Sequence, residues 1–150
     1  HTFKGDWELL HTIGPNAFKK KFPHGNRLEI SRKGADACLN MYEMEVFDGD
    51  GMKLKIAGSA VSSSSEAWGG KNKYLVDGDK STMYHSACDG KDQWVAVDLG
   101  ATKSISRVVV TNRDGYHAWR LDKSEMKLDG KVLKRALRDQ YVDEDAPAIS

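Results

Sequence analysis

The stretch that decides the fold of this chain is Trp94-Val95-Ala96-Val97-Asp98-Leu99, followed after a short link by Ile105-Ser106-Arg107-Val108-Val109-Val110-Thr111. Aliphatic, β-branched and aromatic residues dominate both segments, and β-branched and aromatic residues favour strands. The link from Gly100 to Lys103 begins with glycine, which often marks a turn. We therefore expect two strands here, joined by a short connection.

Shorter segments of the same kind, separated by turn residues, extend this pattern through the chain. The expected strands are Leu28–Ile30, Leu39–Phe47, Met52–Ile56, Glu125–Leu128 and Lys131–Leu133. The reversals at Asp48–Gly51 and Asp129-Gly130 contain glycine, which supplies the positive φ that a tight turn requires. The chain is therefore predicted to be an all-β sandwich or jelly roll. For Lys131–Val142 the periodicity also permits a helix.

With 150 residues, the chain has the size of one domain. We expect residues 1–26 to be an N-terminal extension packing on the sandwich, residues 27–142 to form the sandwich, and residues 143–150 to be a flexible tail. Because the sequence opens at His1 and shows no signal-peptide pattern, we expect a processed protein or a domain of a longer chain.

The composition argues against nucleic acid and membrane insertion. The 23 basic and 22 acidic residues nearly cancel, whereas nucleic-acid binding normally requires a basic excess on one face. Lys19-Lys20-Lys21 is interpreted as a solvated loop. No apolar run approaches the ~20 residues that a membrane-spanning helix needs.

Motifs for catalysis and for zinc are missing from the sequence. It contains no Gly-x-Ser-x-Gly, no Walker loop and no CxxC or HxxxH pair. The chain is therefore expected to be non-catalytic. Its two cysteines, Cys38 and Cys88, fit either one disulfide or two buried thiols.

An oxygen-rich segment, Asp77-Gly78-Asp79-Lys80-Ser81-Thr82, follows the apolar pair Leu75-Val76. Hard cations prefer such carboxylate, carbonyl and hydroxyl oxygens. An EF-hand is excluded, because Thr82 stands where that loop needs glycine and Cys88 where it needs glutamate. By composition alone, a plain Asp-Gly turn is the stronger interpretation.

Three motifs in order resemble a known family. Leu75–Thr82 is similar to its apolar-apolar-Asp-Gly-Asn-x-x-Thr loop, Gln93–Gly100 to its Trp-x-x-Val-Asp-Leu-Gly strand, and Ile105–Arg113 to the next strand, which ends in Asn-Arg. From about Ala57 to Leu128 the chain resembles the discoidin-type, galactose-binding-like β-sandwiches, and more closely the F-type (fucose-binding) lectins. The resemblance implies a secreted or cell-surface module that binds a glycan or glycoprotein, alone or within a larger multidomain or multivalent protein.

A structural calcium ion is implied by the same resemblance. Asp77 would supply a carboxylate, Asp79 a main-chain carbonyl, Thr82 its hydroxyl and carbonyl, and Tyr74 a carbonyl. Oxygen ligands of this kind are what Ca²⁺ requires.

The family completes this calcium site with a glutamate from its last strand. The matching segment here is Leu39–Phe47, near the front of the chain, where Glu43 would be the ligand and the Tyr42 carbonyl would lie beside it. The order of the motifs therefore implies a circularly permuted sandwich. If Glu43 and the Asp77–Thr82 loop meet at one ion, Cys38 and Cys88 come to the same end of the sandwich and can form a disulfide.

The sugar site implied by the resemblance consists of His85, Arg113 and Arg120. The two arginines keep the family's seven-residue interval, and Tyr84–Cys88 is similar to its aromatic-His-Gly-Ser-Cys segment. Guanidinium and imidazole groups form hydrogen bonds with sugar hydroxyls. An aromatic wall could come from Tyr84, Tyr116, His117, Trp119 and Trp68.

Three departures from the family pattern favour a sugar-type ligand over fucose in particular. One extra residue separates His85 from Arg113, Arg113-Asp114-Gly115 replaces Arg-Gly-Asp, and Tyr116-His117 replaces an adjacent cysteine pair. A terminal sugar such as fucose or galactose is therefore expected. The alternatives are a discoidin-like protein- or surface-interaction domain, an accessory domain of a glycoside-active enzyme, and, for the arginines, surface ion pairs with Asp114 or Asp122.

Overall fold

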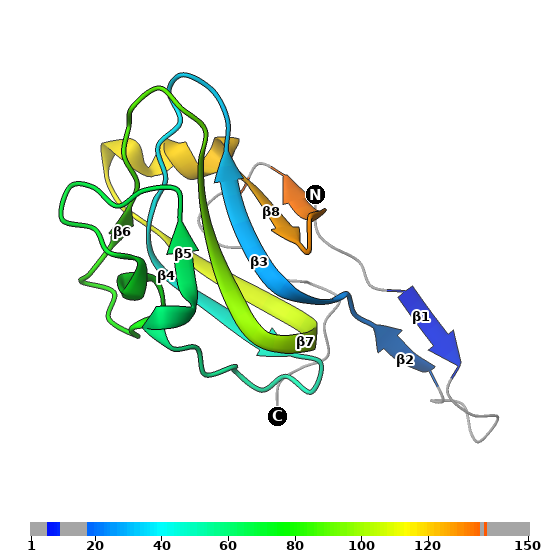
Figure 1. Ribbon diagram of the computed structural model, residues 1–150. Helices are drawn as coiled ribbons and strands as arrows, with labels where there is room; N and C mark the ends of the chain where they lie inside the picture. The colour runs from blue at the N-terminus through cyan, green and yellow to red at the C-terminus, as the bar shows by residue number, and fades with distance from the viewer. Residues whose placement is uncertain (1–5, 10–17, 136, 138–150) are drawn as a thin grey trace.

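The computed structural model describes residues 6–9, 18–135 and 137, and it shows antiparallel strands with short 3₁₀ helices (Figure 1). The elements in chain order are β1 (Asp6–Leu9), β2 (Phe18–Lys21), β3 (His24–Arg32), β4 (Asn40–Asp48), η1 (Gly58–Ala60), β5 (Val61–Ser63), η2 (Asn72–Val76), β6 (Tyr84–His85), β7 (Gln93–Asn112), η3 (Tyr116–Lys123), β8 (Glu125–Leu128) and β9 (Lys131–Arg135). The predicted all-β fold class is confirmed.

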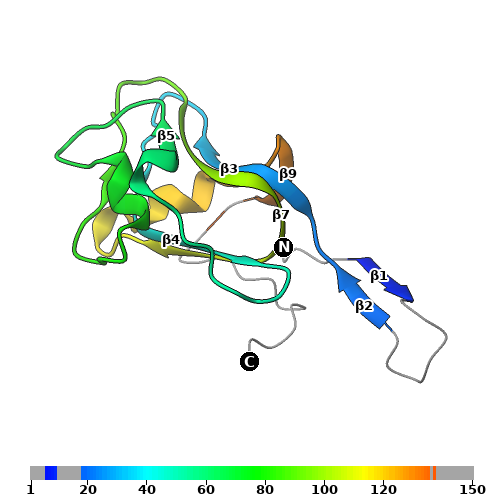
Figure 2. The same ribbon diagram turned by 60° about the horizontal axis from the view of Figure 1, so that its bottom comes forward.

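The long strand β7 organises the sandwich. Its first part pairs with β3 and β5, as in Leu28 opposite Val97, and its second part pairs with β4, as in Val46 opposite Val108. The strand order is β6-β4-β7-β3-β8-β9, with β5 also on β7. Figure 2 shows how β7 curves, so that one strand contributes to both layers.

Both strands predicted from the deciding stretch are present, but the expected loop between them is not. β7 runs without a break through residues 100–103, because Lys103 and Ser104 pair with the start of β3. Gly100, whose φ is 83°, provides the change of direction without ending the strand. The strand therefore turns a corner where the sequence indicated a link.

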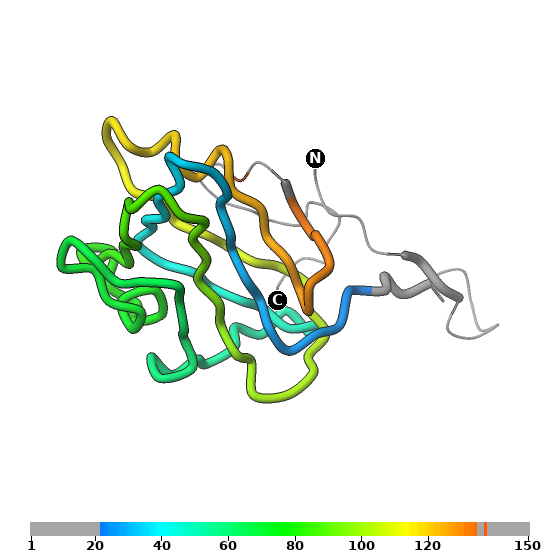
Figure 3. The backbone as a smooth tube through the Cα atoms, turned by 45° about the horizontal axis from the view of Figure 1, so that its top comes forward, coloured from blue at the N-terminus to red at the C-terminus, as the bar shows by residue number. Residues whose placement is uncertain are grey.

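Alternate residues of the strands form one hydrophobic core between the layers. Leu28 and Ile30 of β3 lie beside their register partners Val97 and Val95 of β7, and all four side chains are fully buried. Figure 3 shows β3 lying between β7 and the β8–β9 hairpin, in the order that the strand pairing gives. Burial of each such side chain stabilises the fold by about 1.5–3 kcal/mol.

Other predicted elements fare differently. The hairpin at Asp129-Gly130 is confirmed, and residues 131–135 are strand rather than helix. Residue 137 is in neither, and the other residues of the helical alternative lie outside the described part of the chain. The strand predicted at Met52–Ile56 is wrong. Only one bridge forms there, between Phe47 and Lys53, and the backbone pairing with β4 ends at the bond from the Leu54 N–H to the Val46 carbonyl.

The N-terminal strands β1 and β2 form their own two-stranded sheet. The expected loop at Lys19-Lys20-Lys21 is therefore wrong, since Lys20 pairs with Trp7 in this sheet. The packing of residues 1–26 on the sandwich stays a prediction, and the tail 143–150 lies outside the described residues. Among the described residues, no helix is long and apolar enough to cross a membrane.

Candidate functional site

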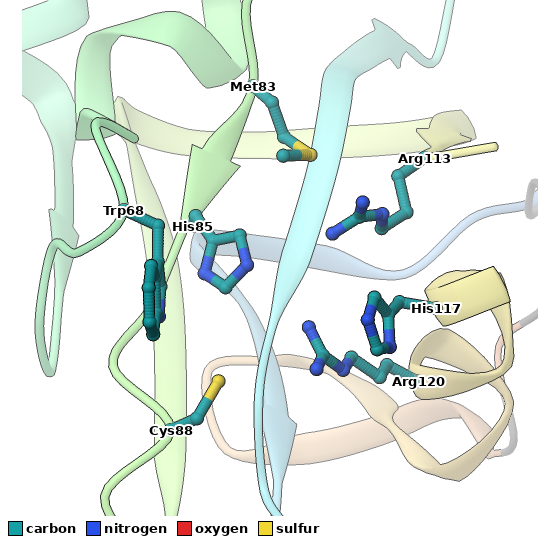
Figure 4. A pocket seen from close by; sticks show the side chains of 7 residues that line it. All are labelled: Trp68, Met83, His85, Cys88, Arg113, His117 and Arg120. Carbon is teal, nitrogen blue, oxygen red and sulfur yellow. The ribbon is translucent and has the colours of Figure 1, made fainter. Parts of the chain in front are cut away.

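Two regions of the chain, residues 68–88 and 113–120, meet at a cavity of about 430 Å³ and contribute four segments to it. The segments are the loop before η2, β6 with its flanking residues, the turn after β7, and η3. In Figure 4, Trp68 and His85 lie on one side, and Arg113, His117 and Arg120 lie on the other. The lining residues are Trp68, Met83, His85, Cys88, Arg113, His117 and Arg120. The structure thus brings together the three residues predicted to bind sugar.

His85 is held in one orientation by its surroundings. It is buried, and its Nδ1 lies 2.7 Å from the Ser86 carbonyl oxygen, which can only accept a hydrogen bond. Nδ1 therefore carries the hydrogen, and Nε2 of the neutral ring is left as an acceptor. Gly70 permits this packing, because a Cβ there would lie 2.6 Å from the His85 Cβ.

Protonation of His85 is disfavoured in the folded state. Burial first, and then the charges of Arg120, Arg113 and His117, lower the pKa of His85 below its ordinary value of 6.5. A hydrogen bond to the Ser86 carbonyl opposes this shift. At neutral pH the ring is therefore an uncharged acceptor beside two cations.

His85 should contribute a loss of stability as the pH drops below about 6.5, because the unfolded chain then binds the His85 proton that the folded state disfavours. Glu43, whose raised pKa of about 7 acts in the opposite direction over this range, is common to both proteins and cancels in their comparison. A His85→Gln variant should therefore gain stability relative to the wild type as the pH falls from about 7.5 to 5.5, measured by urea denaturation of both proteins. Identical pH profiles for both proteins would contradict the prediction.

Arg113 and Arg120 have no hydrogen bond or ion pair in the part of the chain that the structure describes. The alternative ion pairs are not formed, and Asp114 instead accepts a hydrogen bond from the Tyr42 hydroxyl at 2.9 Å. Arg113 Nε and His117 Nδ1 are buried without partners. Unpaired buried polar groups are costly, so the hydrogen-bonding capacity of this cluster is not met by the described part of the protein.

The candidate aromatic wall is only partly at the cavity. Trp68 lines it and is 78% exposed, with its ring centroid 6.4 Å from that of His85. Tyr116 is also exposed and packs edge-on against His117, which lines the cavity. These three residues can offer ring surface to a sugar.

Two of the aromatic candidates are corrected by the structure. Tyr84 is completely buried, and its hydroxyl donates to the Ser65 carbonyl, so it cannot contact a ligand. Successive side chains of a strand point to opposite faces, so the Tyr84 side chain points into the core while that of the next residue, His85, points to the cavity. Trp119 does not line the cavity, because its ring stacks with Arg32, whose guanidinium carbon lies 4.8 Å from the ring centroid.

Arg32, which no sequence motif indicates, contacts the helix η3 that carries two of the cavity residues. It is almost fully buried, donates to the Cys38 carbonyl at 3.3 Å and pairs with Asp36 at 3.2 Å. Through Trp119 it anchors η3, which carries His117 and Arg120. No motif marks Arg32 in the sequence, since it is simply the last residue of a strand.

Cys38 and Cys88 form a disulfide, with their Cα atoms 4.9 Å apart and 50 positions between them in sequence. Cys88 also lines the cavity. The bond therefore ties the segment after β6 to the start of β4 beside the candidate site.

A Cys38→Ser/Cys88→Ser double variant is expected to lose about 2–5 kcal/mol of unfolding free energy, because the bond restricts the unfolded chain. Urea denaturation of both proteins without reductant measures the loss. The wild type with reductant serves as a control and should approach the variant. Equal stability of wild type and variant would show that the bond contributes nothing.

Three of the predicted calcium ligands, Asp77, Asp79 and Thr82, contact one another, and Glu43 lies near Asp77. The Thr82 hydroxyl lies 2.6 Å from an Asp77 carboxylate oxygen and 2.9 Å from the Asp79 carbonyl. Across from them, one Glu43 carboxylate oxygen accepts the Gly78 N–H at 3.0 Å. The other oxygen of Glu43 is buried without a partner.

This unpartnered carboxylate oxygen fits a cation. Burial first, and then the nearby Asp77 carboxylate, raise the pKa of Glu43 to about 7. A divalent ion would satisfy the orphaned oxygen and offset the repulsion between Glu43 and Asp77. The Asp79 carboxylate is turned to Ser81, so only its carbonyl faces Thr82.

The remaining predicted ligands lie on neighbouring elements. Tyr42 precedes Glu43 on β4, and Tyr74 lies in η2 just before the Asp77–Thr82 loop. Within the described residues, no three His, Cys, Asp or Glu side chains cluster tightly enough to hold a metal. Any ion would therefore depend on two carboxylates together with hydroxyl and main-chain oxygens.

Comparison with known proteins agrees with this fold. Residues 74–130 match the family model described as NedA-like, galactose-binding domain. The match includes the Asp77–Thr82 loop, His85, Arg113 and Arg120, whereas Glu43 lies outside it. Comparisons with curated proteins and with solved structures give no significant match.

The strand arrangement and the family match together define an all-β, galactose-binding-like sandwich. The predicted resemblance is thus confirmed at the level of the domain. Domains of this class are carbohydrate- or protein-binding modules and are generally non-catalytic.

Proposed function

We propose that this protein is a non-catalytic, lectin-like module of the F-type kind that binds a terminal sugar in the cavity of His85, Arg113 and Arg120. The observation that carries the proposal is the convergence of these three side chains from separate segments, with both guanidinium groups unpaired. Ligand cavities typically measure about 300–1,000 Å³ and contain a few such polar groups.

Each group has a distinct role in binding. Arg113 and Arg120 donate hydrogen bonds to sugar hydroxyls or the ring oxygen. His85 accepts a hydroxyl hydrogen at Nε2, because its Nδ1–H is directed to the Ser86 carbonyl. Trp68 offers its ring to the apolar C–H face of the sugar.

A structural calcium ion belongs to this proposal. Glu43, Asp77 and Thr82 would hold it through side-chain oxygens, while Asp79, Tyr74 and Tyr42 would contribute carbonyls. When bound, the ion supplies positive charge that neutralises the two carboxylates. The Asp77–Thr82 loop leads into β6, so a fixed loop also fixes His85, and less conformational entropy is lost when sugar binds.

The sandwich is proposed to be circularly permuted and exported. The strand β4, which carries Glu43, precedes the matched region 74–130 yet pairs with β7 inside it. A disulfide is typical of oxidising compartments, which supports a secreted or cell-surface protein. Because a single sugar site binds weakly, avidity would come from repeated copies or a larger parent chain.

The test is thermal unfolding in EDTA, in calcium, and in calcium with millimolar L-fucose or D-galactose. A ligand that binds only the folded state raises the melting temperature. We expect one rise with calcium and a second with sugar. A calcium rise without any sugar effect would reject sugar binding, and no calcium effect on the fully stripped protein would reject the metal site.

A second candidate function is protein or surface interaction, as in discoidin-like domains. It is favoured by the exposure of Trp68 and Tyr116, at 78% and 87%, because aromatic residues are enriched at protein interfaces. A glycan array separates the two functions, since an interaction domain of this kind would bind none of the glycans.

A further inference from the structure

The charged side chains that line the cavity are all of one sign. Four of its lining residues are nitrogen bases, namely Arg113, Arg120, His85 and His117, and none is acidic. The remaining lining residues are Trp68, Met83 and Cys88. A sugar that offers only hydroxyl groups would leave the two guanidinium charges without a counter-charge.

Carboxylates near the cavity are engaged elsewhere. Asp114, although adjacent to Arg113 in sequence, accepts the Tyr42 hydroxyl. Asp36 lies 3.2 Å from Arg32 and 3.7 Å from Lys123. Among the described residues, therefore, no acidic side chain pairs with the cations that line the cavity.

The cations also repel one another. Burial lowers the pKa of Arg120, and the charges of Arg113 and Arg32 lower it further. His117 shows the same pattern, because desolvation and then Arg120 and Arg113 lower its pKa. An anion in the cavity would relieve this repulsion, since an opposite charge nearby stabilises each cation.

Three of the nitrogen-containing side chains lie close enough together to bind one anionic group. Arg113, His117 and Arg120 lie on one side of the cavity, opposite Trp68 and His85 (Figure 4). Arg113 Nε and His117 Nδ1 are buried without hydrogen-bond partners. A guanidinium group matches the oxygens of a carboxylate or sulfate with two parallel hydrogen bonds.

We infer that the preferred ligand of this cavity is an acidic sugar, whose carboxylate or sulfate group binds to Arg113, His117 and Arg120 while its ring lies against Trp68 and His85. This inference rests on the proposed sugar-binding function. It narrows the proposed ligand class from sugars in general to acidic sugars, which should bind more tightly than neutral sugars of similar shape.

The test uses sugars that differ only in charge. D-galacturonate and D-galactose differ only at C6, as do D-glucuronate and D-glucose, and D-galactose 6-sulfate replaces the carboxylate by a sulfate ester. Calorimetric titrations in calcium should show the acidic member of at least one pair binding about 10-fold or more tightly than its neutral partner, since hydrogen bonds between ionised groups are the stronger ones. The sulfate and carboxylate arms identify which anion is preferred.

Salt and substitution give independent readouts. Raising the ionic strength from low salt to about 0.15 M should weaken acidic-sugar binding more than neutral-sugar binding. Arg113→Gln should reduce the preference for the acidic sugar by about 10-fold. Lys123→Gln, which removes the same charge from a residue that does not line the cavity, should leave the preference unchanged.

The outcomes separate the inference from the function on which it rests. Equal or tighter binding of the neutral sugars would overturn the inference and leave the proposed function intact. Binding of L-fucose alone would overturn only the inference, and binding of neither L-fucose nor any of these sugars would overturn both. Sodium acetate or sulfate binding as tightly as the acidic sugars would also overturn the inference, because the sugar ring would then contribute nothing.

Discussion

An Arg120→Ala variant is expected to bind sugar about 10- to 100-fold more weakly than the wild type, because hydrogen bonds from a charged group contribute about 1.5–3 kcal/mol. The fold should be unaffected. Arg120 makes no hydrogen bond or ion pair within the described residues, and its removal relieves the repulsion with Arg113 and Arg32. The melting temperature without sugar should therefore stay the same or rise.

Lys123→Ala is the matched control for this experiment. Lys123 lies on the same 3₁₀ helix, carries the same charge and approaches Trp119 and Asp36 rather than the cavity. Its removal should leave the sugar affinity within about twofold of wild type, as is usual away from the centre of a site. Unchanged binding by Arg120→Ala, or equal losses in both variants, would contradict the assigned role of Arg120.

The second large effect concerns Glu43. A Glu43→Gln variant should lose most of the stabilisation that calcium gives the wild type, which is about 2.7 kcal/mol when the free calcium is 100 times its dissociation constant. In EDTA the difference in stability between the two proteins should disappear or reverse. The variant should then be at least as stable as the wild type, because it replaces a buried carboxylate whose pKa is raised to about 7.

Glu45→Gln provides the control for this reversal. Glu45 lies on the same strand, is partly exposed and pairs with Lys53 at 3.2 Å. It should keep the full calcium response and behave like the wild type in EDTA. A calcium response that survives in Glu43→Gln would show that the ion, if it binds, does not use this carboxylate.

Features that depend on local residue patterns could be predicted from the sequence. The apolar runs at Trp94–Leu99 and Ile105–Thr111 lie in β7, and Asp129-Gly130 forms its hairpin turn, because side-chain alternation and glycine act within a few residues. Met52–Ile56 has the same local pattern but lacks a partner strand beyond one bridge. Strand formation depends on pairing that the sequence does not reveal.

The candidate site shows a similar division. His85, Arg113 and Arg120 could be found from the spacing of one family motif, and the structure places them around one cavity. The role of Arg32 could not be found, because it comes from tertiary contacts with Trp119 and the Cys38 carbonyl. Burial of Tyr84 depends likewise on which face of a two-residue strand meets the core.

The 3₁₀ helix η3 was not predicted either. It starts after Gly115, whose φ of 84° breaks the extended backbone that follows β7. The helix brings His117 and Arg120 to the same side of the cavity as Arg113, so that two arginines seven residues apart in sequence line one cavity. The sequence motif indicates the two arginines but not the turn that places them together.

The most direct test of sugar binding in this cavity is an NMR titration that follows the Nε–Hε signals of the arginine side chains. Assignment by Arg→Lys variants distinguishes Arg113 and Arg120 from Arg27 and Arg107, which do not line the cavity. We predict that a bound sugar shifts the signals of Arg113 and Arg120 and leaves those of Arg27 and Arg107 unchanged. Binding that shifts only Arg27 or Arg107, or no shift with any neutral or acidic sugar, would contradict the proposed site.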